Sequence, residues 1–122
     1  KESDMISIHC PLLPETTNLI NIDAFRKMKP TAFVVNTARG GIVNEGDLLT
    51  ALQEKLIAGA ALDVVSEEPM EVAALFQFDN FLCSPHMAWY SQESALELKR
   101  KIAEEAVRFA NGEAVKYPVN HL

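Results

Sequence analysis

Three short polar signatures in this chain each follow a run of apolar residues, and their residue types could carry chemistry. The first is Asn36-Thr37-Ala38-Arg39-Gly40-Gly41, the second begins at Asp63 and reaches Glu67-Glu68-Pro69, and the third is Ser84-Pro85-His86. Open α/β sheets bind ligands at the carboxyl ends of their strands. An arginine, a carboxylate and a histidine at such ends therefore predict one site at the edge of a parallel sheet.

Arg39 suits the recognition of a planar anion. Its guanidinium offers two parallel donors to a carboxylate and keeps its charge near neutral pH. Gly40 and Gly41 follow without side chains, so that a ligand or another backbone segment can approach closely. The alternative interpretation is a surface arginine in front of a flexible loop.

His86 suits proton transfer, because imidazole titrates near neutrality. Glu68 would orient it, and Pro69 fixes the turn directly after Glu68, which favours Glu68 over its neighbour Glu67. The alternatives are a histidine that hydrogen-bonds backbone at a strand end and an exposed acidic turn. For His9, a structural role is at least as plausible as ligand contact, and nothing is expected of His121.

Asp63 ends a strand of small apolar residues, where an unpaired carboxylate would be unfavourable. We therefore expect it to accept hydrogen bonds from backbone or from a ligand amide. Arg39, His86 and a carboxylate together fit hydride transfer to or from a 2-hydroxy acid: the arginine holds the substrate carboxylate, and the histidine exchanges the hydroxyl proton. Such a reaction requires a cofactor, because no side chain accepts a hydride.

The elements that must position these residues alternate between strands and helices. Apolar runs predict strands within 5–10, 32–36, 58–65 and 80–84. Helices are expected between them: a short one capped by Asn21 or Asp23, one capped by Asn44 with Leu48, Leu52 and Leu56 as its core stripe, and a turn near 72–76. A longer helix from Ser91 to about Asn111 follows. This order predicts an α/β fold with a parallel sheet covered on both faces.

Composition narrows the class of protein. The 122 residues carry a net charge of −6 and a pI of about 5.0, which argues against nucleic acid or anionic membrane as a partner. The isolated cysteines Cys10 and Cys83 are typical of reduced core thiols in a cytoplasmic protein, and no metal site is expected. The start at Lys1 runs directly into a strand, which suggests the latter part of a longer fold.

The quoted motifs resemble the D-isomer-specific 2-hydroxyacid dehydrogenases, NAD-dependent oxidoreductases. The resemblance rests on 7–12, 35–41, 59–64, Glu68-Pro69 and Ser84-Pro85-His86, and 12–41 is most similar to the phosphoglycerate dehydrogenase branch. It implies that 1–90 form the C-terminal half of a doubly wound, three-layer α/β/α Rossmann-type domain. Residues 91–122 would form a long helix and tail returning toward a substrate domain.

The resemblance also implies roles for individual residues. Arg39, Glu68 and His86 match the catalytic residues, and Asp63 matches the aspartate that holds the nicotinamide carboxamide. Trp89 would wall the substrate pocket together with Arg39 and His86. The expected contacts to NAD, with NADP left open, are Cys10, Pro11, Thr17, Thr37, Ala38, Arg39, Asp63, His86 and Ala88. Thr17 would lie on the adenine side.

Two departures from the family pattern bear on function. The glycine-rich phosphate loop and the acidic residue for the ribose are absent from this sequence, so we expect the chain alone to be inactive or a weak binder of NAD. Ala88-Trp89-Tyr90-Ser91 resembles the C-terminal binding proteins, NAD-linked corepressors of the same fold. The leading expectation is an enzyme acting on a small 2-hydroxy or 2-keto acid, homodimeric in its full-length parent. A corepressor-like binding protein and an inactive chain that self-associates through its open sheet edge are the alternatives.

Overall fold

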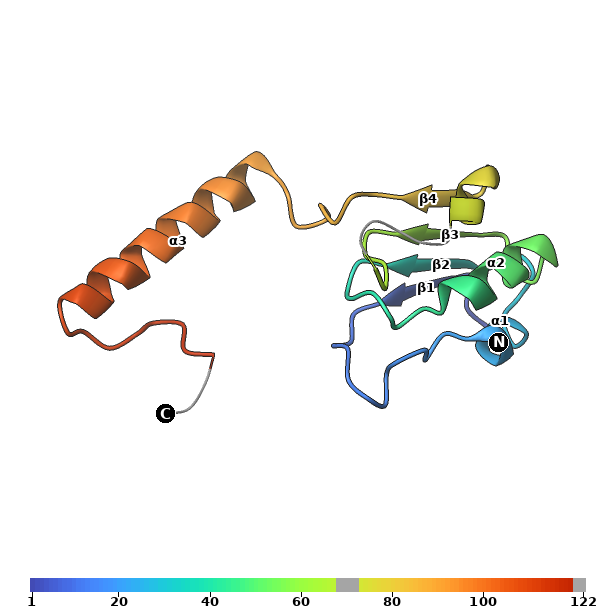
Figure 1. The fold of residues 1–122 in the computed structure, drawn as a ribbon, viewed down its shortest axis with the longest axis horizontal. Coiled ribbons are helices and arrows are strands. Elements are labelled where there is room, and N and C mark those ends of the chain that lie inside the picture. The colour runs from blue at the N-terminus through green and yellow to red at the C-terminus, as the bar shows by residue number, and fades with distance from the viewer. Residues whose placement is uncertain (68–72, 120–122) are drawn as a thin grey trace. The chain divides into compact units, whose positions relative to one another are not determined.

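The computed structural model describes residues 1–67 and 73–119, and the chain divides into two compact units, Lys1–Ala88 and Trp89–Leu122. The first unit contains four strands: β1 (Met5–Ile8), β2 (Phe33–Asn36), β3 (Gly59–Leu62) and β4 (Phe81–Cys83). They pair in parallel in the order β1-β2-β3-β4, as Figure 1 shows. The predicted α/β fold with a parallel sheet is confirmed, although each strand is shorter than its apolar run.

The strand ends are level with one another. Ile8 pairs with Asn36, Asn36 with Leu62, and Leu62 with Cys83, so that each of the four strands ends in the same row of the sheet. All four following loops therefore leave the sheet along one edge, which is the arrangement that the three polar signatures require.

Helices in the first unit begin at residues whose side chains satisfy free backbone donors. Asn21 accepts from the Ala24 amide to start α1 (Ile22–Phe25), and Asn44 accepts from the Asp47 amide to start α2 (Glu45–Gln53). A 3₁₀ helix, η1 (Ala73–Gln77), precedes β4. Of the two residues expected to cap the short helix, Asn21 and Asp23, Asn21 is the cap, and the expected cap at Asn44 is confirmed.

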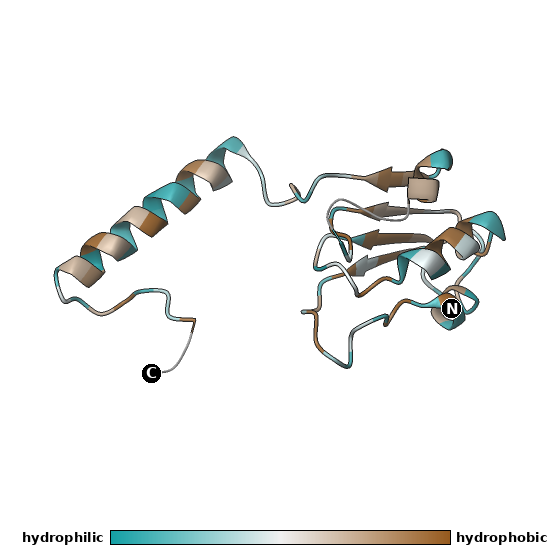
Figure 2. Cartoon of the chain, viewed as in Figure 1, coloured by the Kyte–Doolittle hydropathy of each residue, from teal (hydrophilic) through white to brown (hydrophobic). Residues whose placement is uncertain are grey.

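One face of the sheet carries the hydrophobic core. Consecutive parallel strands joined by right-handed crossovers place their connecting helices on the same face. Figure 1 shows α2 in front of the strands, and α1 packs against α2. The buried side chains of this layer include Phe25, Val34, Leu48, Leu52, Leu62 and Leu75. Figure 2 shows the same concentration of apolar residues in the strands.

The opposite face of the sheet differs from the expectation of a covered sheet. Met5, Phe33 and Leu82 project from this face and are 65%, 44% and 67% exposed. The helices α1, α2 and η1 place buried side chains in the core on the other face, and no helix among the described residues of this unit covers the open one.

The leucine stripe of α2 was expected to extend to Leu56, but the helix ends at Gln53. Lys55 adopts a left-handed conformation with φ of 55°, and the Leu56 amide donates to the Ala51 carbonyl at 2.8 Å. The chain therefore turns toward β3 before the third leucine is reached. Leu56 still packs against the core from outside the helix.

The second unit consists of α3 (Gln92–Ala110) and a following tail. Ser91 accepts from the Ser94 amide at 3.0 Å, and the Ser94 hydroxyl accepts from the Ser91 amide at 2.7 Å, which makes a reciprocal capping box. Asn111 ends the helix, and Gly112 follows with φ of 71°. The predicted start and stop are confirmed. The apolar stripe, with Leu98, Ile102 and Phe109, is exposed.

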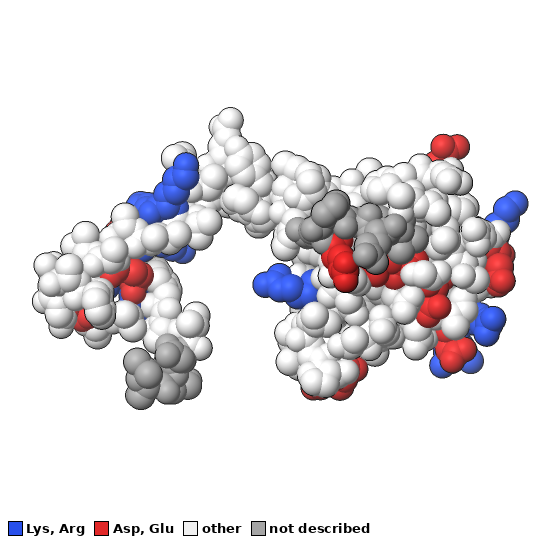
Figure 3. Space-filling model, in the orientation of Figure 1, with Lys and Arg blue, Asp and Glu red and all other residues white. Residues whose placement is uncertain are grey.

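The distribution of charged and apolar side chains in the structure agrees with the expectations from the sequence. Acidic side chains are spread over the helical face of the first unit in Figure 3. On α3, Arg100 pairs with Glu97 and Glu104 one turn away on either side. Among the residues described, no helix is long and apolar enough to span a bilayer.

Candidate functional site

A cavity of about 660 Å³ opens at the carboxyl edge of the sheet, between the loops that follow β1 and β2. Its volume lies in the range usual for small-molecule and cofactor sites. The residues that line it are His9, Cys10, Pro11, Leu12, Thr37, Ala38 and Arg39. Five of these are predicted cofactor residues, and the fold brings all five together.

Asn36, the last residue of β2, holds the loop that carries Arg39. Its side chain is 1% exposed, its Oδ1 accepts from the Ala38 amide at 3.0 Å, and its Nδ2 donates to the Arg39 carbonyl at 2.9 Å. Both polar ends of the buried amide are therefore satisfied, and both partners lie within three residues. This pair of bonds fixes the backbone from which the Arg39 side chain emerges.

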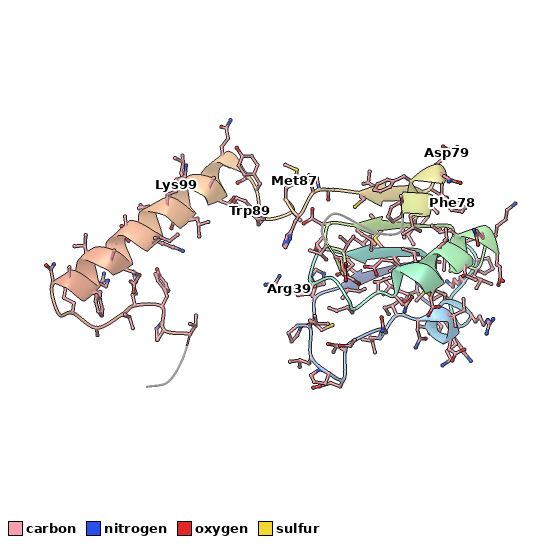
Figure 4. The ribbon with its side chains drawn as sticks, in the orientation of Figure 1. Arg39, Phe78, Asp79, Met87, Trp89 and Lys99 are labelled. Carbon is pink, nitrogen blue, oxygen red and sulfur yellow. The ribbon has the colours of Figure 1, made fainter. Side chains whose placement is uncertain are left out.

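Arg39 itself is exposed at the strand ends, where Figure 4 shows it projecting away from the sheet. One guanidinium nitrogen, Nη1, donates to the Ala38 carbonyl at 2.7 Å. Within residues 1–67 and 73–119, no carboxylate lies within ion-pair distance of this guanidinium. The positive charge is thus open to an anionic ligand, as its chemistry predicts.

The loop after β3 is anchored from the start of α2. Glu45 accepts from the Ser66 amide at 2.8 Å and from the Ser66 hydroxyl at 2.9 Å through Oε1 and 2.7 Å through Oε2. Ser66 stands two residues before Glu68. The predicted catalytic Glu68 itself lies outside the described residues.

Asp63 follows β3 directly and is 4% exposed. Its Oδ1 accepts from the Ser84 hydroxyl at 2.5 Å and from the Met87 amide at 2.9 Å, and its Oδ2 accepts from the Ala88 amide at 2.9 Å. Burial raises the pKa of Asp63, but hydrogen bonds from Ser84, Ala88 and Met87, with the charge of His86, lower it below its usual value. The expectation that this carboxylate meets donors is confirmed.

His86 stands at the same edge, in the loop after β4. Its backbone is left-handed with φ of 52°, and its amide donates to the Ser84 carbonyl at 3.0 Å. β2 and β4 are separated by one strand, so their ends are about 10 Å apart at the usual spacing of neighbouring strands. A small molecule lying across the end of β3 would bridge the Arg39 and His86 loops.

Comparison with known proteins identifies this arrangement. Residues 1–88 match the family model described as the D-isomer specific 2-hydroxyacid dehydrogenase, NAD binding domain. The chain belongs to this family.

Relatives and solved structures agree with that assignment. The chain is 44% identical over 117 residues to a human D-3-phosphoglycerate dehydrogenase, covering 96% of the chain and 22% of that protein. It is 46% identical over 109 residues to a glyoxylate reductase from Thermofilum pendens, covering 88% and 31%. A D-lactate dehydrogenase from Lactobacillus jensenii, crystallised with NAD+, superposes with a TM-score of 0.90 at 31% identity, over 99% of the chain and 41% of that structure.

The chain therefore spans about a fifth to a third of the length of these curated relatives. All the relatives named here are dehydrogenases or reductases, which favours the enzyme interpretation over the corepressor one. The dehydrogenase family match and the NAD-bound neighbour make NAD the cofactor expected at the cavity.

The residues at the cavity fit such a cofactor. Pro11 and Leu12 present apolar surface, Ala38 is small, and Thr37 adds a hydroxyl beside the Arg39 cation. A planar ring with polar substituents needs this combination of apolar walls and few polar groups. Among the described residues, no cluster of three histidine, cysteine or acidic side chains is placed to hold a metal ion.

Not every predicted dehydrogenase residue joins the cavity. Thr17 is not among its lining residues, and the Thr17 hydroxyl donates to the Leu13 carbonyl at 2.9 Å within its own turn. Trp89 belongs to the second unit, where its ring meets Tyr90 edge-on with 5.5 Å between centroids. His9, for which two roles were open, lines the cavity and shares a 2.7 Å hydrogen bond with Ser7.

Three residues important to this geometry were given no role from the sequence: Asn36, Glu45 and Ser84, although Asn36 and Ser84 each begin one of the polar signatures. Each acts through hydrogen bonds to a loop rather than through its own chemistry. A polar residue at the end of an apolar run, as at 36 and 84, is the signal that could have identified two of them. Glu45 gives no such signal, because its partner Ser66 lies 21 residues away.

Proposed function

We propose that the gene product carrying this sequence is an NAD-dependent D-2-hydroxyacid dehydrogenase that interconverts a small 2-hydroxy acid and the corresponding 2-keto acid. The observation that carries the proposal is the exposed Arg39 at the rim of the cavity, with Asp63 after the neighbouring strand β3 and His86 after β4 beyond it. Phosphoglycerate-like hydroxy acids are the favoured substrate class, by the relatives' names.

Arg39 would bind the substrate carboxylate. Two parallel N–H donors match the two oxygens of that group, and the same cation polarises the adjacent carbonyl when a 2-keto acid is bound. Its backbone is fixed by Asn36, so the side chain approaches the ligand from a constant position.

His86 would exchange the proton of the substrate hydroxyl. In oxidation the imidazole takes that proton as the C–H bond breaks, and in reduction the imidazolium returns it to the carbonyl oxygen. The nicotinamide, when bound, accepts or supplies the hydride, which no side chain can carry. Glu68 is proposed as the partner that orients the histidine.

Cys10, Pro11, Thr37 and Ala38 are the residues proposed to hold the nicotinamide side of the cofactor, since they line the cavity beside Arg39. Asp63 retains acceptor capacity for one further donor: a carboxylate has about four acceptor sites, and three are occupied by Ser84, Met87 and Ala88. A carboxamide N–H of the cofactor would take the fourth. Thr17 and Trp89 remain proposed contacts of the adenine side and of the substrate.

The test is turnover of 2-keto acids with NADH by the purified gene product and its variants. Arg39→Ala and His86→Ala should each abolish turnover. Arg39→Lys is the matched control for charge: it keeps the cation but loses the bidentate fork, and should raise KM for the keto acid strongly while retaining measurable kcat. Full turnover by either alanine variant would remove that residue from the mechanism.

The corepressor alternative has one sequence observation in its favour, Ala88-Trp89-Tyr90-Ser91. It predicts NADH-dependent assembly that survives His86→Ala, measured by light scattering after size exclusion. The dehydrogenase proposal predicts a homodimer whose mass does not respond to NADH. A cytoplasmic location belongs to the same proposal and is tested by fractionating cells that express the tagged gene.

A further inference from the structure

Asp63 and Ser84 form a clamp around His86. Ser84 lies two residues before the histidine, and Met87 and Ala88 are the two residues after it. The Asp63 carboxylate accepts from the Ser84 hydroxyl and from both following amides, at 2.5 to 2.9 Å. The side chain of Asp63, at the end of the neighbouring strand β3, therefore holds the residues on both sides of His86.

The backbone between the clamped residues is in an uncommon state. His86 has φ of 52°, a left-handed conformation that non-glycine residues seldom adopt and that persists only where the surroundings enforce it. The His86 amide also donates to the Ser84 carbonyl at 3.0 Å, which tightens the same turn. The three Asp63 bonds fix the residues on both sides of this backbone position.

Burial makes the clamp hard to open. Asp63 is 4% exposed, so a donor lost from the carboxylate is not readily replaced by bulk water. Ser84 is half-buried, whereas His86, Met87 and Ala88 are exposed. The buried side of the clamp is therefore in the sheet, and the residues that it holds, His86 among them, lie on the exposed side.

We propose that Asp63 and Ser84 are positioning residues for His86, which set the direction of the imidazole through the conformation of residues 84–88. This role rests on the proposed dehydrogenase function for its effect on turnover. The positioning role does not depend on a contact between Asp63 and the cofactor. Ser84 does not line the cavity, and it acts on the loop through its hydrogen bond to the Asp63 carboxylate.

The experiment compares Ser84→Ala, Ser84→Thr and Asp63→Asn in the full gene product. Thr50→Ala is the matched control: it also deletes a hydroxyl with one hydrogen bond, to the Gly46 carbonyl at 3.2 Å, but on α2. The first measurement is hydrogen exchange by mass spectrometry on a peptide covering residues 85–89. The second is kcat and KM for a 2-keto acid and for NADH.

Ser84→Ala and Asp63→Asn should speed exchange in that peptide at least tenfold. Asp63→Asn replaces one of the two oxygens that accept from the Met87 and Ala88 amides, and Ser84→Ala removes the donor that holds the Asp63 carboxylate in place. Ser84→Ala should lower kcat about 10- to 100-fold, with KM for NADH within about twofold of the wild type. Ser84→Thr, which keeps the hydroxyl, should restore both quantities, and Thr50→Ala should change neither.

Unchanged exchange in Ser84→Ala and Asp63→Asn would overturn the clamp. Accelerated exchange with wild-type kcat would overturn the positioning role, and so would a threonine variant as slow as the alanine one. If the wild type turns over no 2-keto acid, the proposed function fails, and the exchange data alone decide whether the clamp exists.

Discussion

Gly40 lies against the backbone of Val65 so closely that a Cβ built on it would be 1.8 Å from the Val65 carbonyl oxygen. The loop that carries Arg39 and the loop that leaves β3 are therefore in direct main-chain contact. Glycine is required at position 40 because a side chain would not fit there, and not because of a turn. The contact fixes the distance between two of the three loops that build the site.

Gly40→Ala should force these two loops apart. We expect a loss of about 1–3 kcal/mol in the free energy of unfolding, because a methyl group inserted against rigid backbone displaces its surroundings. Urea denaturation followed by circular dichroism measures it. Gly46→Ala is the control: its Cβ would meet only the Asn44 Oδ1 at 3.4 Å, and in a helix alanine should be neutral or stabilise by up to about 1 kcal/mol. Equal stabilities of the two variants would contradict the steric argument.

Asn36→Ala should loosen the Arg39 loop. The substitution leaves the Ala38 amide and the Arg39 carbonyl without their partner, at a cost of about 1–3 kcal/mol in stability. In the gene product it should also raise KM for the keto acid, since Arg39 is no longer held. Asn80→Ala removes a comparable bond, to the Ala58 carbonyl at 2.6 Å, at the opposite edge of the sheet. It should lower stability and leave KM unchanged; a rise in KM there would refute the local explanation.

The lowered pKa of Asp63 makes stability depend on pH in a defined direction. The unfolded chain takes up a proton near the usual value of 3.8, and the folded protein does so only at lower pH. The stabilisation is thus fully present above about pH 4 to 5 and is lost as pH falls through the folded value. In Asp63→Asn this contribution is absent at every pH. The difference in unfolding free energy between the two proteins should therefore shrink from pH 6 to pH 2, and a constant difference would disprove the linkage.

Ser91→Ala should shorten α3 at its first turn. The substitution removes the acceptor of the Ser94 amide, and a lost cap of this kind costs about 0.5–2 kcal/mol. Ser94→Ala removes the reciprocal acceptor of the Ser91 amide. The double variant should lose less than the sum of the two single ones, because the hydroxyls act as one box. Helix content by circular dichroism against urea measures all three, and strict additivity would argue against the coupling.

The sequence was sufficient to predict features that depend on interactions between residues close together in the chain. Asn21, Asn44 and Ser91 were expected to begin helices and do so, because a cap bonds an amide only two or three residues away. The parallel sheet also follows from the alternation of apolar runs and helices. Leu56 was expected in the helix only because of its spacing from the other leucines. The left-handed backbone of Lys55, which ends the helix earlier, cannot be recognised from that spacing.

The sequence indicated which residues of the site could carry chemistry, but not which residues hold their loops in place. Arg39 and His86 stand out by residue type and by their position after apolar runs. The bond that holds the His86 loop connects Ser84 to Asp63, and the bond that holds the loop after β3 connects Glu45 to Ser66, 21 residues apart in each case. Such pairs depend on the register between neighbouring strands and helices, which a single sequence does not specify. The open face of the sheet was missed for the same reason, since strand order decides on which side the helices lie.

Asn36, the last residue of β2, and Asp63, directly after β3, each hold a loop of the site through their own side chain. Asn36 binds the loop that follows its own strand, and Asp63 binds the loop that follows the neighbouring strand β4. In each case, one polar side chain connects the sheet to the loop that carries the proposed catalytic residue. Loops from other members of the family should therefore fit onto this sheet, provided that Asn36, Asp63 and Ser84 are kept.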